Sequence, residues 1–460
     1  MPELPEVETV RRLLEKTVVG KQVSSIELFR AKNVATDPKE FLAVIPGKTI
    51  TRIIRKGKLL GFVFDEDYIL TSHLRMEGKY FFHADVQPRG KHDIFRFLFR
   101  DGGELVYNDV RKFGRVGLYP LEGYQKHSPF AELGPEPFDM KPEELLAQLK
   151  GKNLPIKQCI MDQSIVSGIG NIYADESLFA SHVHPLEKAK NVSLEKCQAI
   201  LTNASRIMNE SIEEGGSTVR SYHPGEGIDG LMQLRLQVYG KEGESCPRCG
   251  FPLNRITVNG RGTTYCPKCQ KSPQIPFVLG LTGPIHSGKS TAATYFISQG
   301  YAHFDADVVA KNAYLDPMVK KAVIHLLGRK AYEGKNLNAA YIREKLTAKP
   351  SLKKELEAIV HPYVIAKARE FIAVSKDKVL LDVPLLFPSH MDEFCDATLL
   401  ILAPLELRAK RIEDEGRDAS RLLAINRDYP LEEAKRKARF IVDNDAGLEE
   451  FYSRLKELPL

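Results

Sequence analysis

The most reactive group that the sequence could expose is a proline directly behind the initiator methionine. If Met1 is removed, Pro2 becomes the N-terminus, and its secondary amine, with a reference pKa of roughly 7.7–8.0, is nucleophilic near neutral pH. Glu3 beside it could carry protons. A secondary amine that attacks a sugar carbon forms an iminium, whose fixed charge promotes elimination. The same stretch is also typical of a plain helix start, since Pro5 suits a first helical position and apolar residues follow at helical spacing.

Four of the seven cysteines form two close pairs, Cys246 with Cys249 and Cys266 with Cys269, separated by sixteen residues. Four thiolates from two turns satisfy tetrahedral zinc and leave no position open. This spacing therefore predicts one structural zinc per chain and does not indicate a disulfide framework.

A phosphate-binding loop follows an apolar run at 277–281 that we predict to be a strand. It fits the pattern G-x-x-x-x-G-K-[ST], and its expected ligand-binding residues are Gly283, His286, Ser287, Gly288, Lys289, Ser290 and Thr291. In such a loop the backbone amides cradle phosphates, the lysine reaches the β and γ oxygens, and the serine hydroxyl ligates magnesium. ATP with magnesium is the expected cofactor.

Asp307 in the sequence FDAD is a candidate base for a phosphoryl transfer, because it could take the proton of an attacking hydroxyl. An aspartate that caps a helix would look the same. Downstream, Val360-His361-Pro362 indicates a helix end, and Val379–Phe387 reads as a buried parallel strand. The loop, the candidate base and the strand together predict an α/β kinase fold.

In the first half of the chain, a β-rich region and a helical region must position Pro2. Short β-rich runs between about 20 and 120, such as Ile50–Ile54, Leu59–Phe64 and Ile94–Phe99, predict a β-sandwich packed against the N-terminal helix. A helical region follows, in which Gly168 and Gly170 set a tight turn before a helix beginning near Asn171. Amides in such a turn can bind a phosphate, with Lys152 and Lys157 adding charge, although a plain turn between two helices is the alternative.

Composition sets outer limits. The chain of 460 residues is long enough for two or three domains, and no stretch of about 18 apolar residues is present, so we expect a cytoplasmic protein with no membrane partner. The formal net charge of +6 is too weak to indicate nucleic acid by itself.

MPELPEVETV resembles the N-terminus of bacterial formamidopyrimidine-DNA glycosylases, also called MutM, and further matches run in the family's order to Cys269. The resemblance implies that Pro2 attacks, Glu3 shuttles protons and Lys58 of RKGKLL donates a proton in β-elimination. It places Arg261 of VNGRGTTYC against the lesion phosphate and links it to δ-elimination. A strand-edge lysine and a solvated hairpin arginine are the structural alternatives.

The same resemblance implies how the enzyme would hold DNA. A base in a duplex must be extruded before an enzyme can reach it, and the vacated stack must be filled. Met76 and Phe113 would fill and wedge the stack, although ordinary core packing is the alternative for both. Arg111 would meet the orphaned base, and His92 matches a DNA-contacting position. The run 151–179 resembles the family's helix-two-turns-helix, which makes Lys152, Lys157 and Asn171 DNA-binding candidates. The glycine-rich segment 215–230 would be a loop over the flipped base, or a plain connection.

Residues 277–460 resemble dephospho-coenzyme A kinase more loosely. Pro284 and His286 stand where that family tends to have glycines, Pro388 replaces an expected glutamate, and Asn426 stands near an expected lid glutamine. The resemblance implies an arginine-rich lid helix that carries Arg408, Arg411, Arg417 and Arg421, although a solvated helix face would look the same.

The sequence thus predicts four domains: a catalytic helix and β-sandwich at 1–130, a helix-two-turns-helix domain at 131–235, a zinc finger at 236–270, and a P-loop kinase with a parallel sheet at 277–460. The expected function is double: excision of oxidised purines such as 8-oxoguanine and formamidopyrimidines from double-stranded DNA with strand nicking, and ATP-dependent phosphorylation of dephospho-coenzyme A. One alternative is an endonuclease VIII-like glycosylase. Another is a DNA-binding zinc protein whose P-loop domain is a different kinase or a degenerate nucleotide sensor.

Overall fold

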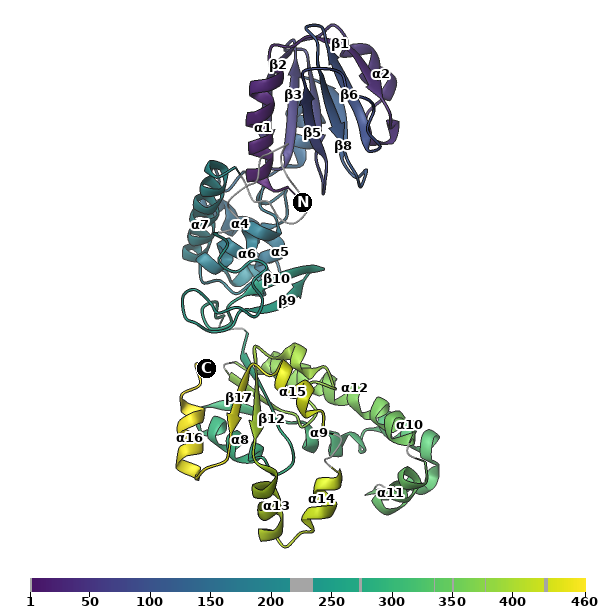
Figure 1. The fold of residues 1–460 in the computed structure, drawn as a ribbon, viewed down its shortest axis with the longest axis vertical. Coiled ribbons are helices and arrows are strands. Elements are labelled where there is room, and N and C mark those ends of the chain that lie inside the picture. Colours follow the sequence, from purple (N-terminus) through teal and green to yellow (C-terminus); the bar gives the residue numbers. More distant parts are fainter. Residues whose placement is uncertain are drawn as a thin grey trace. The chain divides into compact units, whose positions relative to one another are not determined.

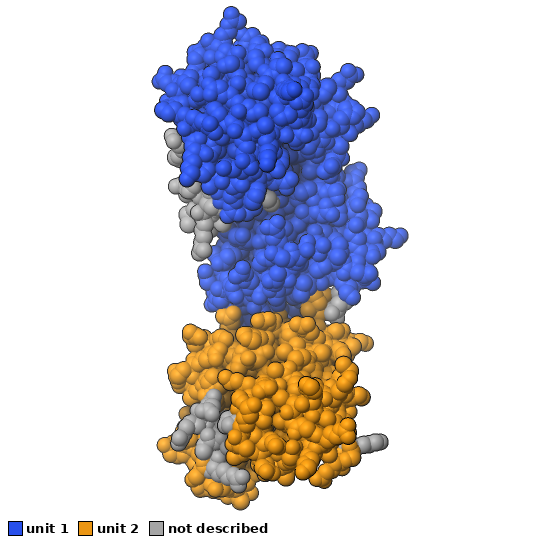
Figure 2. Space-filling model, turned by 90° about the vertical axis from the view of Figure 1, so that its right-hand side faces the viewer, with its two compact units in different colours: residues 1–271 blue, residues 272–460 orange. Residues whose placement is uncertain are grey.

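The computed structural model describes residues 2–215, 235–272, 275–334, 336–349, 351–376, 378–425 and 429–460. The chain divides into two compact units, residues 1–271 (unit 1) and residues 272–460 (unit 2), which are coloured separately in Figure 2. Each unit has its own hydrophobic core.

Unit 1 begins with a helix, continues as a β-sandwich and ends in helices and a hairpin (Figure 1). Its helices are α1 (Leu4–Val18), α2 (Pro38–Val44), α3 (Tyr124–His127), α4 (Pro142–Leu149), α5 (Ile156–Ile160), α6 (Asn171–Ala180) and α7 (Leu194–Glu213). Its strands are β1 (Val23–Leu28), β2 (Ile50–Lys56), β3 (Leu59–Phe64), β4 (Tyr68–His73), β5 (Lys79–His83), β6 (Asp93–Phe99), β7 (Glu104–Asn108), β8 (Arg115–Pro120), β9 (Asn254–Val258) and β10 (Arg261–Tyr265).

The predicted β-sandwich is confirmed as two four-stranded antiparallel sheets, in the orders β1-β6-β7-β5 and β2-β3-β4-β8. Strand β3 is buried along its whole length because both of its faces are covered. Leu60, Phe62 and Phe64 point into the sandwich core, whereas Leu59 and Val63 belong to a second cluster that includes Phe130. This double burial explains why the strand reads as a continuous apolar run and not as an alternating one.

Helix α1 joins the two cores of unit 1. Val7, Val10 and Leu14 pack into the sandwich core, whereas Leu4 packs into the core of the helical region. The first turn of the helix therefore lies where the sandwich meets the helices, and Pro2 and Glu3 are buried there.

Unit 2 is built on a five-stranded parallel sheet in the order β12-β15-β11-β16-β17. Its strands are β11 (Phe277–Thr282), β12 (Tyr301–Asp305), β15 (Lys378–Asp382), β16 (Ala397–Leu402) and β17 (Phe440–Asp443), with a small hairpin of β13 (Tyr332–Glu333) and β14 (Asn336–Leu337). Its helices are α8 (Lys289–Ser298), α9 (Ala306–Ala313), α10 (Pro317–Leu327), α11 (Ala339–Ala348), α12 (Ser351–Val374), α13 (Leu405–Asp414), α14 (Ala419–Ile425), α15 (Leu431–Lys437) and α16 (Leu448–Lys456). The predicted α/β fold is confirmed.

Two details of unit 2 differ from the sequence-based expectation. Helix α12 does not end at Pro362 but continues through it, because Val360 and Val364 on either side are buried in the core, and their packing outweighs the hydrogen bond that a proline removes. Strand β15 ends at Asp382, well before Phe387. The next residues form a turn that contains Pro384, which has no N–H to continue the ladder.

Candidate active sites

Glu3 lies at the junction of α1 with the glycine turn before α6. Its side chain is 2% exposed, and its carboxylate accepts three backbone hydrogen bonds. The donors are the amides of Gly170 at 2.7 Å, Ile172 at 2.9 Å and Tyr173 at 3.4 Å. The sequence predicted that amides of this turn would face a phosphate, but these three bind Glu3. A helix N-terminus leaves such amides unpaired and favours a negative charge, so the carboxylate suits the position.

The glycine turn is shaped by this carboxylate. Gly168 has a φ of +98°, and a Cβ at Gly170 would lie 2.2 Å from the Glu3 Cδ. A side chain at position 170 would therefore displace the carboxylate. The predicted glycine turn is confirmed, and its second glycine is required by Glu3.

Lys58 is the second buried charge of this site. Its side chain is 5% exposed, and Nζ donates a hydrogen bond to the Ile169 carbonyl at 2.9 Å. Burial lowers the pKa of Lys58, against the opposing charges of Glu3 and Glu6. Burial likewise raises the pKa of Glu3, against the charge of Lys58. Both shifts move the groups toward the pH range in which a side chain can give and take protons.

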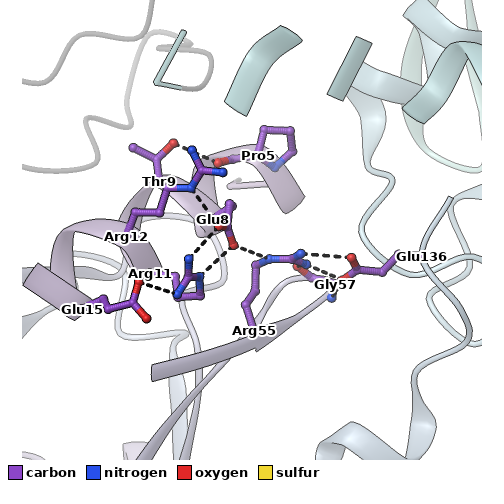
Figure 3. Close-up of polar contacts among 9 residues, drawn as sticks. All are labelled: Pro5, Glu8, Thr9, Arg11, Arg12, Glu15, Arg55, Gly57 and Glu136. Atoms are coloured by element: carbon purple, nitrogen blue, oxygen red, sulfur yellow. Dashed lines mark hydrogen bonds and ion pairs between the residues drawn. The ribbon is translucent and has the colours of Figure 1, made fainter. Parts of the chain in front are cut away.

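Arg55 fixes the turn that carries Lys58 (Figure 3). Its Nε contacts Glu8 Oε2 on α1 at 3.0 Å, and its Nη2 contacts Glu136 Oε2 at 3.0 Å. Glu136 also accepts the hydrogen bond of the Gly57 amide at 2.5 Å. Gly57, the residue next to Lys58, is thus fixed by a network that includes residues of α1, β2 and the segment before α4.

Arg261 lies just behind the tip of the β9–β10 hairpin. Asn259 and Gly260 have φ values of +46° and +71°, as the two central residues of a tight hairpin turn require. The Arg261 side chain is exposed, and its charge adds to the lowering of the pKa of Lys58 and of Lys157. The predicted hairpin position is confirmed, and the guanidinium lies close enough to Lys58 to act on its charge.

Lys157 does not lie on the surface, where added positive charge was expected. Its side chain is fully buried, and Nζ contacts Asp175 Oδ1, Asn171 Oδ1 and Thr263 Oγ1, each at 2.7 Å. The amide of Asn171 donates to the Gly262 carbonyl at 2.9 Å. Burial lowers the pKa of Lys157, while Asp175 opposes the shift. Lys157 therefore joins α5 and α6 to the hairpin. Lys152, in contrast, is half-buried.

The remaining candidates for DNA contact come from the loops of the β-sandwich. Phe113 is 56% exposed and Arg111 is exposed with its Nε on Glu77 at 3.1 Å, while Met76 and His92 are half-buried.

Hydrogen bonds with two buried side chains fix the loop that carries Arg111 and Phe113. Buried Asp109 accepts hydrogen bonds from the amides of Arg111 at 3.0 Å and Gly114 at 2.7 Å. Asn33 donates to the Gly114 carbonyl at 2.7 Å. An exposed phenylalanine on such a braced loop can act as a wedge, because the loop does not fold it back into the core.

The four cysteine thiols converge as the zinc prediction requires. The Sγ atoms of Cys246 and Cys269 are 3.9 Å apart, those of Cys249 and Cys266 are 3.6 Å apart, and all four lie within 4.8 Å of one another. Tetrahedral zinc with Zn–S bonds of about 2.3 Å needs Sγ separations of about 3.8 Å. The site fits a closed structural zinc.

In unit 2 the phosphate-binding loop connects β11 to α8 and borders a cavity of about 850 Å³. Of the predicted ligand-binding residues, the cavity is lined by Gly283, His286, Gly288, Lys289, Ser290 and Thr291, whereas Ser287 is buried. Gly288 has a φ of +102°, and a Cβ there would lie 1.9 Å from Asn444 Nδ2. Asn444 in turn donates to the Ser287 carbonyl at 2.9 Å. The loop has the shape that holds nucleotide phosphates, and the donors around the cavity fit ATP.

Lys289 and Asp307 both face this cavity. Lys289 Nζ contacts Asp382 Oδ1 at the end of β15, at 2.6 Å. Asp305, not Asp307, caps α9 by accepting the hydrogen bond of the Val308 amide at 3.0 Å. Burial raises the pKa of Asp307, against the charge of Lys289. The structure thus separates the capping aspartate from the one that can face an acceptor.

The departures from the kinase pattern leave the loop intact. His286 adopts a φ of +56°, which a glycine would adopt without strain. Its carbonyl accepts a hydrogen bond from Arg411 at 3.1 Å, and the Ile285 carbonyl accepts one from Arg408 at 2.7 Å. Burial lowers the pKa of both arginines. These two residues lie on α13 and brace the loop from outside. The predicted single lid helix is wrong, because α13 ends at Asp414 before Gly416, which has a φ of +72°, and Arg421 lies on the separate helix α14.

Known protein families match unit 1 and unit 2 separately. Four family models match: the formamidopyrimidine-DNA glycosylase N-terminal domain at 1–116, its H2TH domain at 133–223, the zinc finger found in FPG and IleRS at 243–271, and dephospho-CoA kinase at 277–450. The formamidopyrimidine-DNA glycosylase of Exiguobacterium sibiricum is 47% identical over 275 residues, which are 59% of this chain and 99% of that protein. The chain belongs to the formamidopyrimidine-DNA glycosylase family.

Relatives and solved structures of the family extend this match. The formamidopyrimidine-DNA glycosylase of Streptococcus pneumoniae is 44% identical over 275 residues, with 99% of that protein covered. A complex of a Lactococcus lactis FPG mutant with DNA that contains Fapy-dG has 40% identity and a TM-score of 0.56. MutM in complex with carbocyclic 8-oxo-G DNA has 41% identity and a TM-score of 0.55. Both cover 59% of this chain and all of the solved chain.

Several residues of the glycosylase-family unit escaped sequence reasoning. Tyr173 and Glu136 contact Glu3 and Gly57 from distant parts of the chain. Asp175 contacts Lys157 from the next helix, and Glu6 accepts the hydrogen bond of the Glu3 amide within the first turn of α1. In unit 2, Asp382 was within a predicted strand but carried no expected role. No local spacing marks such residues, although a buried polar side chain in an apolar run, as in VLLDV, is a usable signal.

Two predictions fall outside the described residues: nearly all of the segment 215–230, expected to cover a flipped base, and Asn426 in the predicted lid. Within the described part of the chain, no helix combines the length and apolarity needed to cross a membrane.

Proposed function

We propose that unit 1 excises oxidised purines, such as 8-oxoguanine and formamidopyrimidines, from double-stranded DNA and then nicks the strand. The observation that carries the proposal is the buried pair of Glu3 and Lys58 beside Pro2, in a chain that spans 99% of its glycosylase relative. The similar solved structures are complexes with DNA that contains Fapy-dG or carbocyclic 8-oxo-G, which supports the substrate class.

In the proposed reaction the amine of Pro2, freed by loss of Met1, bonds to C1′ while the bond from C1′ to the base breaks. Glu3, whose pKa is raised by burial, shuttles the protons that ring opening and iminium formation require. Loss of a C2′ proton then breaks the C3′–O3′ bond, and Lys58 supplies a proton in this β-elimination. Arg261 would hold the phosphate near the lesion and assist δ-elimination.

The remaining sites receive roles that fit their positions. Phe113 and Met76 would fill the vacated stack, Arg111 would meet the orphaned base, and His92 and Lys152 would contact the backbone. Lys157 and Asn171 would support DNA binding indirectly by positioning the β9–β10 hairpin, since the Lys157 side chain is buried. The zinc would hold that hairpin in place.

The decisive experiment is borohydride reduction of the protein with an 8-oxoguanine duplex, followed by mass mapping of the adduct. The adduct should map to Pro2 with Met1 absent. An adduct on a lysine, or undiminished trapping by Pro2→Gly, would contradict the proposal. Comparing oxidised purines with oxidised pyrimidines in the same duplex distinguishes it from an endonuclease VIII-like activity.

We further propose that unit 2 phosphorylates the ribose 3′-hydroxyl of dephospho-coenzyme A from ATP. The supporting observation is that Lys289, Ser290 and Asp307 share one cavity within a region that matches the dephospho-CoA kinase family. Asp307 would take the hydroxyl proton while Lys289 neutralises charge on the transferred phosphoryl group. Magnesium held by Ser290 would supply further positive charge.

A different or degenerate P-loop domain that only senses nucleotide is the rival for unit 2, and the departures at Pro284, His286 and Pro388 are the features that favour it. Turnover with dephospho-coenzyme A and ATP decides between them. ATP binding without acceptor-dependent transfer would support the sensor, whereas transfer to another small molecule would indicate a different kinase.

A further inference from the structure

One residue, Tyr173 on α6, contacts both glutamates that follow Pro2. Its phenol donates a hydrogen bond to Glu6 Oε1 at 2.8 Å, and its backbone amide donates one to Glu3 Oε2 at 3.4 Å. Glu6 uses its other oxygen to accept the hydrogen bond of the Glu3 amide at 2.8 Å. The first turn of α1 is thereby attached to α6 through a side chain and through the backbone.

The phenol is itself held by a third helix. Ser211 Oγ on α7 lies 2.6 Å from Tyr173 Oη, and both residues are fully buried. The Tyr173 phenol has one proton and donates it to Glu6, so Ser211 donates to Tyr173. Burial and the charge of Glu6 raise the pKa of Tyr173 well above its ordinary value, so the phenol keeps this proton. The chain of donors has one direction, from α7 through α6 to α1.

We propose that Tyr173 is a positioning residue for the Pro2 amine, acting through Glu6. The inference rests on the proposed glycosylase function. The Pro2 ring is bonded to the Glu3 nitrogen through its carbonyl carbon, and that nitrogen is oriented by the hydrogen bond to Glu6. Removing the phenol takes one hydrogen-bond donor from the buried Glu6 carboxylate, so the carboxylate is oriented less precisely toward the Glu3 amide. A nucleophile displaced by about 1 Å can lose up to about a hundredfold in rate.

The contact does more than pack the helix. The apolar side chains of α1 already anchor it in two cores, and a capping box satisfies a helix N-terminus without any third residue. The buried phenol and serine orient the Glu6 carboxylate. Apolar contacts alone cannot do this.

The test uses the full-length protein with the conservative variant Tyr173→Phe, which keeps the ring and removes the hydroxyl. Two quantities are measured: the single-turnover rate of borohydride trapping on a duplex with an abasic site, and Kd for a duplex with the uncleavable tetrahydrofuran analogue. We expect the trapping rate to fall by about tenfold or more and Kd to change by less than about twofold.

Tyr80→Phe is the matched control, because the Tyr80 phenol donates to Ser72 Oγ at 2.8 Å in an equally buried pair inside the β-sandwich. It should trap at the wild-type rate, and thermal unfolding of both variants shows whether each keeps the fold. Equal trapping by Tyr173→Phe and wild type, or equal losses in both tyrosine variants, would overturn the inference.

Two further arms keep the test decisive. If Tyr173→Phe does not fold, Ser211→Ala replaces it, with an expected loss of about threefold in trapping rate at unchanged Kd. Trapping by Ser211→Ala at the wild-type rate then overturns the inference. A wild-type protein that traps nothing would refute the proposed glycosylase function itself, which is a separate result.

Discussion

At the scale of single residues, unit 1 concentrates buried ionisable groups around the N-terminal turn of α1. Glu3 and Lys58 are both nearly inaccessible, and each opposes the pKa shift that burial imposes on the other. In a buried site, each of two opposite charges favours the charged form of the other, whereas burial of one group alone would favour its neutral form. The chemistry therefore depends on the pair.

His73, at the end of β4, gives a pH prediction. Burial, with the charges of Arg75 and Lys58, lowers the pKa of His73 to about 3. The folded-state pKa lies below the unfolded value, so the stabilisation is present above about pH 6.5 and is lost as pH falls toward 3. His73→Asn can still accept the hydrogen bond of the Arg75 amide, which now goes to His73 Nδ1 at 3.0 Å, but cannot titrate. Between pH 7 and 5 the variant should lose less stability than wild type, by up to about 2 kcal/mol.

Unfolding of the full chain by urea at both pH values, followed for wild type and variant, measures this difference. Other titrating groups contribute equally to both proteins and cancel. Equal losses of stability in the two proteins would show that His73 is protonated in the folded state.

The sequence singled out residues whose possible chemistry is visible in their own type and spacing. Pro2, the four cysteines and the phosphate-binding loop belong to this class. It missed Tyr173 and Asp382, because their partners lie far along the chain and only folding brings them together. The environment of Lys157 was wrong for the same reason: its partners Asp175 and Thr263 come from other elements.

At the scale of elements, the predicted strands were placed well because turns and apolar runs are local signals. The differences arise where tertiary packing overrides a local rule, as in α12 at Pro362, or where a turn shares the composition of a strand, as after Asp382. The glycine turn before α6 shows a further limit, since its amides bind Glu3 from the other end of unit 1.

Gly170→Ala tests that turn. The backbone conformation at Gly170 suits any residue, with a φ of −124°, but the new Cβ would meet the Glu3 carboxylate. We expect trapping on abasic duplex to fall by about tenfold or more while the fold is kept. Gly447→Ala is the control, because a Cβ there meets nothing within 4 Å. Wild-type trapping by Gly170→Ala would show that the carboxylate position is not critical.

The zinc hairpin gives a prediction of its own. Cys249→Ser removes one of four ligands, so the protein should bind less than one zinc and the β9–β10 hairpin should lose its hold on Arg261. Nicking of lesion DNA should be abolished. Phosphorylation of dephospho-coenzyme A, measured on the same sample, should be unchanged and serves as the control for folding. Lesion cutting at the wild-type rate by the zinc-free variant would refute the role given to the metal.

At the scale of the whole molecule, the chain consists of two units that each hold a complete proposed site. The four cysteines and all residues placed near Pro2 lie in residues 1–271, whereas the phosphate-binding loop and its cavity lie in residues 272–460. Strand β11 is the centre of the unit 2 sheet and begins at Phe277, so no strand of that sheet comes from unit 1.

The two activities should therefore be separable. Lys289→Ala removes the charge that meets the phosphates, and Asp307→Asn removes the proposed base, so both should suppress phosphorylation of dephospho-coenzyme A and leave lesion excision intact. Glu3→Gln should do the reverse, because its amide group would turn a donor toward backbone amides that now donate to the carboxylate. Each variant is the folding control for the other.

If the gene is divided near Ser272, we expect the two activities to separate into two fragments. The hydrophobic cores of each unit lie wholly within one product, so we expect two active proteins. Both activities are measured on each fragment and on their mixture. An isolated 273–460 fragment that binds ATP but transfers no phosphate, alone or mixed with its partner, would favour the nucleotide sensor and direct attention to Pro284, His286 and Pro388. Recovery of transfer only in the mixture would show that the kinase site depends on unit 1, contrary to the separate sites inferred here.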